Sequence, residues 1–319
     1  MATLRTAQDL LDHGLIAPEA LAATHAVEAR YAIAVTDAIR SRIAKPDDPV
    51  GRQYIPDAAE LLTLPLETAD PTADAPFTPV PGVVHRYPDR ALLKPLLVCP
   101  VYCRFCFRRE HVGPDGGLLG DAALETALAW FAANPQVGEA ILTGGDPLML
   151  SPRRLTHILD RLAALPHIHT LRIHSRVPVA DPARVTPALL TALNRDKALY
   201  LCVHANHAQE FGPDAAPALR ALHGAGVVLL GQTVLLAGVN DSEAALEGLF
   251  RAMIAHRIKP YYLHALDAAP GTARFAVPDE RARELLRGLR GRVSGLAWPT
   301  FVRESAGGAG KRPIGPAWE

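Results

Sequence analysis

The sequence has no excess of charge of either sign and no long apolar run. Its 33 Lys and Arg residues balance its 33 Asp and Glu residues. No overall field therefore favours nucleic acid or an anionic membrane, and any anion-binding site must be local. The apolar runs are interrupted well before the ~20 residues that a spanning helix needs, and residues 1–13 lack the apolar centre of a signal peptide. We expect a cytoplasmic protein without nucleic-acid or membrane partners.

Cysteine is scarce, which excludes a disulfide framework. There are four cysteines in 319 residues; three are clustered, and Cys202 is alone in an apolar run. This number and placement of cysteines fits a compartment that keeps thiols reduced. A chain of this length can bury a substantial core, so we expect one domain of barrel size with an extra segment, with two compact domains as the alternative.

The clustered cysteines lie within eight residues, in the stretch Cys99-Pro-Val-Tyr-Cys103-Arg-Phe-Cys106. Thiolates this close on a short loop can converge on one inorganic centre. Zinc normally takes a fourth protein ligand, whereas a [4Fe–4S] cluster with three cysteines leaves one iron open to bind and activate a small molecule. The alternative is a set of buried, inert thiols. Arg104, Arg108 and Arg109 argue against it, because positive charge favours thiolates.

This loop resembles the Cys-x3-Cys-x2-Cys loop of radical S-adenosylmethionine (SAM) enzymes. Its flanks resemble the lysine 2,3-aminomutase family, including the shorter relatives that make β-lysine for elongation factor P. The resemblance extends from about residue 79 to residue 316 and includes the stretches 232–241 and 260–264. It implies a [4Fe–4S] cluster on Cys99, Cys103 and Cys106, the cofactors SAM and pyridoxal 5′-phosphate, L-lysine as substrate, and a reducing donor of flavodoxin or ferredoxin type.

The chain divides into three expected regions. From residue 6 to about 44, apolar residues recur at helical spacing and predict helices. Between 46 and 81, eight prolines forbid long helices and favour extended chain wrapped over a surface, with a disordered linker as the alternative. We therefore expect an N-terminal helical and proline-rich region at 1–78, a radical-SAM barrel at 79–270, and a segment carrying a cofactor-binding lysine at 271–319.

From residue 92, short apolar runs alternate with helical segments and, after the first gap, recur about every thirty residues. That period is one strand plus one crossover helix of a parallel sheet. The runs are 92–98, 140–143, 171–173, 199–203, 227–232 and 261–263. Helices are expected at 122–133, 152–165, 216–224 and 242–256, the last capped by Asp241 or Ser242.

Six such units predict an α/β fold, and an open or partial (β/α)6 barrel rather than a doubly wound sheet. Periodicity alone does not separate the two architectures. A doubly wound sheet, however, would carry G-x-G-x-x-G after its first strand, and this chain has no such motif there. The resemblance implies the radical-SAM form of the partial barrel.

Polar residues follow the C-terminal end of every run, where the chemistry of such a fold is expected. Each group alone could be a turn or a capped loop, yet chance would scatter them to both ends. We therefore predict one site on one face of the barrel. The groups are Cys99, Gly144 to Pro147, His174 to Arg176, His204 to His207, Gln232, and His264 with Asp267.

The stretch Gly144-Gly145-Asp146-Pro147 alone would be a turn without a function. After a strand, in a chain with the cysteine loop, it resembles the family's Gly-Gly-Asp motif, whose backbone holds the amino group of SAM. The resemblance also assigns His204 and Gln232 to SAM. As metal ligands, His204 and His207 would lack an acidic partner nearby. The family's Asn-His-Pro has become Asn-His-Ala at 206–208.

The hexapeptide 85–90, His-Arg-Tyr-Pro-Asp-Arg, is expected just before the first strand. Guanidinium groups bind phosphate in bidentate fashion, and a phenol can stack on a pyridine ring. The alternative is a solvated loop with an internal pair between Asp89 and Arg90. The same pattern lies at pyridoxal phosphate in lysine aminomutases, so the resemblance assigns Arg86, Tyr87 and Arg90 to that cofactor.

A glycine-rich segment at 299–313 leads to Lys311. Glycines let a backbone pass close to a cofactor, and an amine partly shielded from water suits a Schiff base. A lysine on such a loop would otherwise be solvated and mobile. The segment resembles the pyridoxal-lysine segment of the family, which makes Lys311 the predicted catalytic residue and the site of the internal aldimine.

Three charged residues match substrate-binding positions of the family. Arg108 matches the arginine for the α-carboxylate, while Asp267 and Glu304 match the two acids for the distal ammonium. An enclosed cation needs nearby negative charge. Glu304 stands where free-lysine enzymes have aspartate and the branch associated with elongation factor P has glutamate. The alternative is that Asp267 caps a loop and Glu304 pairs with Arg303 on the surface.

The sequence therefore predicts an isomerase, a lysine 2,3-aminomutase that converts L-lysine to β-lysine, with elongation factor P modification as one use of the product. In the implied mechanism, the reduced cluster splits SAM, the resulting radical takes a hydrogen from the β-carbon, and the amino nitrogen migrates. One alternative is an aminomutase for another amino acid, such as glutamate. Another is a non-catalytic iron–sulfur electron carrier, which would have no use for Lys311 and would carry four cysteine ligands.

Overall fold

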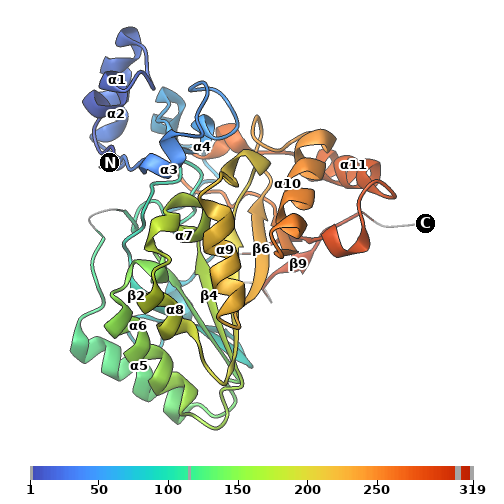
Figure 1. The fold of residues 1–319 in the computed structure, drawn as a ribbon. Helices are drawn as coiled ribbons and strands as arrows, with labels where there is room; N and C mark the ends of the chain where they lie inside the picture. The colour runs from blue at the N-terminus through green and yellow to red at the C-terminus, as the bar shows by residue number, and fades with distance from the viewer. Residues whose placement is uncertain (1–2, 114–115, 306–309, 317–319) are drawn as a thin grey trace.

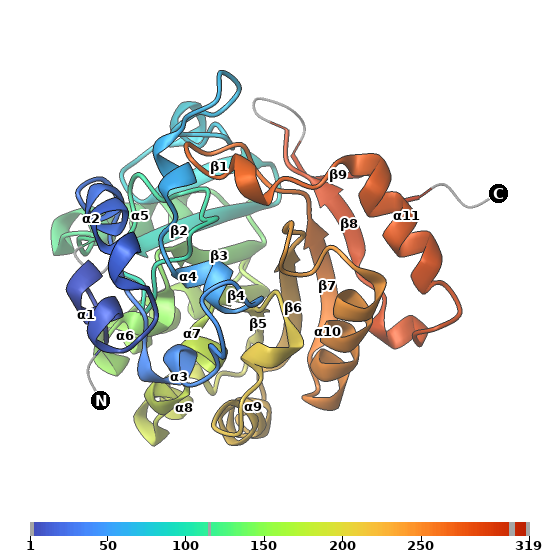
Figure 2. The ribbon, with the colours of Figure 1, turned by 90° about the horizontal axis from the view of Figure 1, so that it is seen from above.

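The strands of the central sheet follow one another in chain order in the computed structural model, which describes residues 3–113, 116–305 and 310–316. In these residues, β2 to β8 run parallel, and β1–β2 and β8–β9 are antiparallel pairs. No pairing of described residues joins β9 to β1, so the sheet curves into a barrel that is open on one side (Figure 2). The strands are β1 (Val83–Tyr87), β2 (Arg90–Leu96), β3 (Glu139–Gly144), β4 (Thr170–Ser175), β5 (Ala198–His204), β6 (Val228–Val234), β7 (Lys259–His264), β8 (Thr300–Arg303) and β9 (Arg312–Pro313).

The six predicted runs form β2 to β7, and the predicted partial (β/α) barrel is confirmed. Helices between the strands cover the outside of the sheet (Figure 1). Ser242 caps α10 as expected, since its side chain accepts a hydrogen bond from Ala245 N. The covering helices are α5 (Asp121–Ala133), α6 (Pro152–Ala163), α7 (Val177–Ala180), α8 (Pro187–Leu193), α9 (Ala215–Gly224), α10 (Glu243–Ala255) and α11 (Asp279–Leu289). Among the described residues, no helix is both long and apolar enough to cross a membrane.

Alternation along the strands separates the two faces of the sheet. On β4 and β5, Leu171, Ile173, Leu199 and Leu201 belong to the main hydrophobic core, and each buried side chain of this size contributes roughly 1.5–3 kcal/mol. The residues between them point the other way, into the barrel. This inner set is largely polar, which suits ligand binding rather than a packed apolar core. It includes Arg172, His174, Cys202 and His204.

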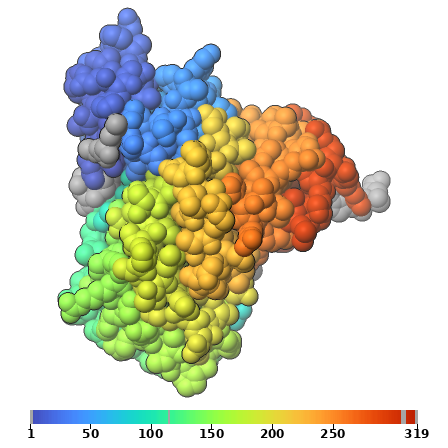
Figure 3. All heavy atoms as spheres, in the orientation of Figure 1, coloured from blue at the N-terminus to red at the C-terminus, as the bar shows by residue number. Residues whose placement is uncertain are grey.

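The N-terminal region is helical, as predicted, and its helices are short. It comprises α1 (Ala7–Asp12), α2 (Leu21–Glu28), α3 (Asp37–Arg40) and α4 (Gly51–Tyr54), followed by 3-10 turns at Ala58–Leu61 and Ala75–Phe77. Its hydrophobic core includes Val101 of the cysteine loop, so the region packs on that loop. Its atoms, coloured blue, gather at the top of the molecule in Figure 3. The domain boundaries after residues 78 and 270 stay a prediction.

The expectation that residues 85–90 precede the first strand is wrong. Residues 85–87 lie in β1, the turn follows, and Arg90 begins β2. The reason lies in the preceding valines, because Val83 and Val84 pair with Leu93 and Leu92 and are buried against the edge of β2. The short strands β8 and β9 were not predicted either.

Candidate functional site

The cysteine loop follows β2, and two backbone hydrogen bonds join it to the N-terminal region. Tyr102 N donates to Ala34 O (3.0 Å) and Arg104 N donates to Gln53 O (2.8 Å). Burial raises the pKa of all three loop cysteine thiols, that of Cys106 to about 11. Three thiolates would therefore need a strongly bound cation to stay ionised here.

The loop arginines act on the thiol pKa in the predicted direction, but they do not outweigh burial. Arg104 and Arg109 both pair with the buried carboxylate of Glu60, and Arg104 Nη2 lies 2.6 Å from its Oε2. Arg108 instead pairs with Asp74, at 3.1 Å. Arg108 and Arg109 lower the pKa of the third loop thiol, but burial outweighs them.

The chemistry of the donor set fits an iron–sulfur cluster better than a single ion. Three thiols on a single loop suit a centre with several irons. Cys202 lies apart, buried on β5 beside His174 of β4, and burial raises its pKa to about 11.

Both glycines of the Gly-Gly-Asp stretch are required by a close approach of two strand ends. Gly144 has a φ of +110°, and a Cβ on Gly145 would collide with the carbonyl oxygen of Val98, just before the first cysteine. The carboxylate of Asp146 is buried and accepts a hydrogen bond from Arg176 N (2.7 Å). The stretch therefore ties the ends of β2, β3 and β4 together.

Three histidines from the ends of β4, β5 and β7 each present a buried ring nitrogen that has no hydrogen-bond partner among the described residues. They are His174, His204 and His264, and the atom is Nε2 in each. Burial lowers the pKa of all three, that of His264 to about 3, so the rings are neutral. Gln232 pairs with His204 across the β5–β6 register. Buried polar atoms of this kind normally have a partner, so these positions fit a polar ligand.

Lys311 and Tyr87 meet across the open side of the barrel. The backbone N of Lys311 donates to the Tyr87 hydroxyl at 2.7 Å, and a Cβ on Gly310 would collide with that hydroxyl. The Arg90 guanidinium lies 3.7 Å from the centre of the Tyr87 ring and also pairs with Asp89 at 2.7 Å. The internal pair of the alternative interpretation is thus present, within a larger contact. Residues 306–309 of the predicted glycine-rich approach lie outside the described residues.

Glu304 is buried between two cations. It pairs with Arg86, and its Oε2 lies 3.1 Å from Lys311 Nζ. The alternative pairing with Arg303 is wrong, because Arg303 pairs with Asp279. Glu304 therefore joins the predicted pyridoxal-phosphate residues to the predicted substrate-binding acids.

Asp267 lies close to the same group of charges. Burial and the charge of Glu304 raise the pKa of Asp267 to about 6, while Lys311 and Arg108 act in the opposite direction. Its carboxylate accepts no hydrogen bond from the described residues, so the alternative of a loop cap has no support there. An unpaired acid in such a setting fits a cationic ligand.

Two charged residues of this group were missed by the sequence analysis. Asp74 lies 3.1 Å from Arg108, 3.5 Å from Lys94 and 3.8 Å from Arg86. Burial opposes its ionisation, but the charges of Arg108 and Lys94 hold the pKa of Asp74 below its usual value. Lys94 was detectable, as a lysine at an inward position of an apolar run. Asp74 lies in the proline-rich stretch, where no motif or periodic pattern in the sequence marks it as a site residue.

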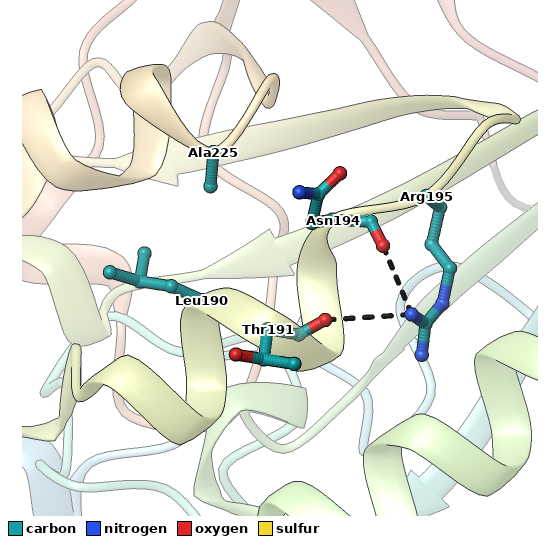
Figure 4. A pocket seen from close by; sticks show the side chains of 5 residues that line it. All are labelled: Leu190, Thr191, Asn194, Arg195 and Ala225. Atoms are coloured by element: carbon teal, nitrogen blue, oxygen red, sulfur yellow. Dashed lines mark hydrogen bonds between the residues drawn. The ribbon is translucent and has the colours of Figure 1, made fainter.

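Two surface hollows lie away from this end of the barrel. One lies at the end of α8, where the Arg195 side chain donates to the carbonyl oxygens of Thr191 and Asn194 (Figure 4). The other lies where strands begin, beside Glu139 and Thr170. Neither contains a predicted cysteine, SAM or substrate residue.

Comparisons with known proteins identify relatives, although no family model matches. The chain is 40% identical to L-lysine 2,3-aminomutase of Escherichia coli (strain K12), over 93% of this chain and 87% of that one. It is 35% identical to the L-lysine 2,3-aminomutase of Haemophilus influenzae, over 82% and 78%. It is 39% identical to that of Fusobacterium nucleatum, over 85% of this chain, but it spans only 64% of that longer protein.

Two crystal structures share the fold. A radical SAM methyltransferase from Sphaerobacter thermophilus matches with a TM-score of 0.50 and 18% identity, over 69% of this chain and 68% of that one. SuiB from Streptococcus suis matches with a TM-score of 0.50 and 15% identity, over 65% and 46%. At this identity the likeness concerns the fold alone, and it confirms the predicted class. Together with the relatives above, it shows that the chain belongs to the L-lysine 2,3-aminomutase family and has a partial radical-SAM barrel.

Proposed function

We propose that the protein is a SAM- and pyridoxal-phosphate-dependent L-lysine 2,3-aminomutase, an isomerase that forms β-lysine. One observation carries the proposal. Lys311, Glu304 and Asp267 share one electrostatic environment with Arg108, which lies two residues beyond the last loop cysteine. This group would supply a lysine for the cofactor, two acids for an ammonium and an arginine for a carboxylate.

The cysteine loop and the strand ends around it would hold the cluster and SAM. Cys99, Cys103 and Cys106 would be the cluster ligands, and the bound pair would supply the radical that removes a hydrogen from the substrate. The backbone at 144–146, His204 and Gln232 would orient SAM. The buried unpaired Nε2 of His204 supports this assignment.

The open side of the barrel would hold pyridoxal phosphate, which supplies the electron delocalisation that amino-group migration needs. Lys311 would be its covalent attachment point. Arg86 and Arg90 would face the phosphate, and Tyr87, fixed by Lys311 N and Arg90, would face the ring. These residues orient the cofactor and exclude water from it.

Cofactor attachment and substrate binding would exchange the ion partners of this group. The α-carboxylate of lysine would replace Asp74 at Arg108, and its distal ammonium would occupy the place at Glu304 that the Lys311 ammonium leaves on cofactor attachment. A glutamate substrate would instead bring a second carboxylate towards Asp267 and Glu304, where like charges repel. This contrast favours lysine over glutamate, and an electron carrier would need none of these groups.

We extend the proposal to the protein's partners. Reduction of the cluster needs an external one-electron donor, for which a flavodoxin or ferredoxin is the expected class. Position 304 is a glutamate, as it is in the relatives associated with elongation factor P. This supports the proposal that the β-lysine is supplied for modification of elongation factor P.

The test is anaerobic turnover of the reconstituted protein with lysine, ornithine and glutamate, followed by chiral analysis of the products. We expect β-lysine from lysine, and selective loss of lysine turnover in Asp267→Asn with the cluster and the bound pyridoxal phosphate intact. Glu284→Gln, in an exposed pair with Arg281, is the matched control and should behave like the wild type. Better turnover of glutamate than of lysine by the wild type would overturn the substrate assignment.

A further inference from the structure

Arg176 joins the Gly-Gly-Asp stretch to the cysteine loop. It follows β4 directly, its side chain is 5% exposed, and its backbone N donates to Asp146 Oδ2 at 2.7 Å. Its guanidinium turns the other way, and Nη1 donates to Cys103 Sγ at 3.3 Å. Among the described residues, no other arginine side chain donates a hydrogen bond to a loop sulfur, although the backbone N–H of Arg108 donates to Cys106.

The guanidinium is fixed in this direction by buried partners. Nη2 donates to Glu210 Oε2 at 2.5 Å and to Gln53 Oε1 at 2.6 Å. The aromatic rings of Tyr54 and Phe105 lie 5.1 and 5.4 Å from its central carbon. Few other orientations are therefore open to the side chain.

Glu210 is the counter-charge of this arginine and is itself fixed. It is fully buried, and it accepts hydrogen bonds from the backbone N of Asn206 (2.7 Å) and of His207 (3.0 Å). Its two oxygens thus connect the turn after β5 to Arg176. Because an arginine stays charged in proteins, the buried pair is one permanent positive and one negative charge beside the loop.

Nη1 is the donor of Arg176 that would serve a bound cluster. Its hydrogen bond to Cys103 Sγ comes from a charged group. Hydrogen bonds from charged donors are roughly twice as strong as those between neutral groups, so this contact would act strongly on a cluster thiolate.

We propose that Arg176 is a positioning residue that sets the reduction potential of a cluster on Cys99, Cys103 and Cys106, with Glu210 as its opposing charge. The inference rests on the proposed function, because it requires the cluster. One-electron reduction adds a negative charge to the cluster and its thiolates. Hydrogen bonds to the sulfurs and nearby positive charge stabilise the reduced form and raise its potential. The carboxylate of Glu210 acts against this effect.

The test is an anaerobic redox titration of the reconstituted full chain, followed by electron paramagnetic resonance of the reduced cluster. Arg176→Gln should lower the ratio of reduced to oxidised cluster at a fixed potential about tenfold, which is ~59 mV for one electron. Arg176→Lys, which keeps the charge, should shift it less. Glu210→Gln should shift it in the opposite direction. A purely structural role would not give shifts of opposite sign.

Arg42→Gln is the matched control. Arg42 is also buried, and it donates to Glu210 O at 2.7 Å and pairs with Asp214, without a hydrogen bond to a cysteine. Its replacement should leave the potential within the error of the wild-type value. Equal potentials in the wild type and both Arg176 variants, with full cluster content, would overturn the inference and leave the proposed function standing.

A measurement on the unaltered chain covers the case in which a variant does not fold. In wild-type protein labelled with 15N-arginine, pulsed electron paramagnetic resonance of the reduced cluster should detect a 15N coupling. The coupling should persist when Arg108 is replaced by lysine. Its absence from a fully loaded wild-type cluster would overturn the inference, whereas a wild type that binds no iron and sulfide would overturn the proposed function itself.

Discussion

The side-chain nitrogen of Lys311 lies 3.1 Å from Oε2 of Glu304, so the lysine predicted to carry the cofactor pairs with an acid predicted to bind the substrate. The same acid also pairs with Arg86. Attachment of pyridoxal phosphate would remove the lysine ammonium from this group. One carboxylate is thereby shared between cofactor loading and substrate binding.

Glu304→Gln should therefore affect the two processes in opposite directions. Lys311 loses its ion partner, so pyridoxal phosphate should attach faster. Lysine binding loses one charged partner, worth about 1.5–3 kcal/mol, so the KM for lysine should rise roughly 10- to 100-fold. Absorbance of the bound cofactor and initial rates measure the two effects. Glu304→Asp, which keeps the charge, is the control, and an unchanged KM in Glu304→Gln would contradict the assignment.

Lys311 is expected to be the attachment point of pyridoxal phosphate. Borohydride treatment of the loaded protein, followed by peptide mapping, should place the label on Lys311 alone. Lys311→Ala should keep the cluster and the fold but lose turnover. Lys197→Ala is the control, because the Lys197 amine donates to Ile168 O (2.5 Å) outside the proposed site. A label on Lys94 or Lys259 would show that another amine holds the cofactor.

The raised pKa of Asp267, about 6, predicts a pH dependence of lysine binding. The substrate ammonium needs the ionised acid, so the KM for lysine should fall as the pH rises through about 6. Asp267→Asn should have a higher KM and should lack this transition. The pH profile of kcat/KM measures it, and a profile of Asp267→Asn in which kcat/KM still rises through pH 6 would assign the transition to another group.

The same shift makes a separate prediction about stability. A carboxyl group whose pKa is raised in the folded state stabilises the protein below its unfolded pKa of about 4. That contribution is lost as the pH rises through about 6. Only about one pH unit of the transition lies between pH 5 and the folded pKa, and Asp267 is partly exposed. We therefore expect Asp267→Asn to gain about 1 kcal/mol relative to wild type between pH 5 and pH 7.5. Urea unfolding at both pH values tests this, and an equal difference at both would contradict it.

The loop cysteines should bind iron, and Cys202 should not. Replacement of Cys99, Cys103 and Cys106 by alanine should abolish bound iron and sulfide under anaerobic reconstitution. Cys202→Ala should keep both, because Cys202 lies buried on β5, apart from the loop. Equal loss of iron in Cys202→Ala would show that the ligand assignment is wrong.

The parts of the molecule that the sequence predicted are those with a local pattern. The spacing of apolar runs predicted β2 to β7. The polar residues that follow the runs lie at one end of the barrel, and that this end carries the site stays a prediction. Glu60, Asp74 and Glu210 show what was missed. Their partners are 44, 34 and 34 residues away along the chain. A buried ion pair of this kind has no periodic signal and becomes visible only when the fold brings the segments together.

Glu60 gives the strongest prediction about stability. Its carboxylate is fully buried and pairs with Arg104 and Arg109 of the cysteine loop and with Arg274. Although burial opposes ionisation, the charge of Arg104 and its neighbours holds the pKa of Glu60 below its usual value. This contribution is therefore present at neutral pH and is lost only as the pH falls through that lowered pKa.

Glu60→Gln leaves two or more buried guanidinium groups without their counter-charge, which typically costs 3–5 kcal/mol, so we expect a loss of about that size at pH 7. The loss should shrink at acid pH, where the wild type also loses the ionised carboxylate. Glu284→Gln, in its exposed pair with Arg281, should leave the urea midpoint almost unchanged. Because Arg104 and Arg109 belong to the cysteine loop, Glu60→Gln should also reduce iron incorporation. A variant as stable as wild type would show that the arginines find water or other partners, and that the N-terminal region holds the loop through Val101 and the backbone hydrogen bonds alone.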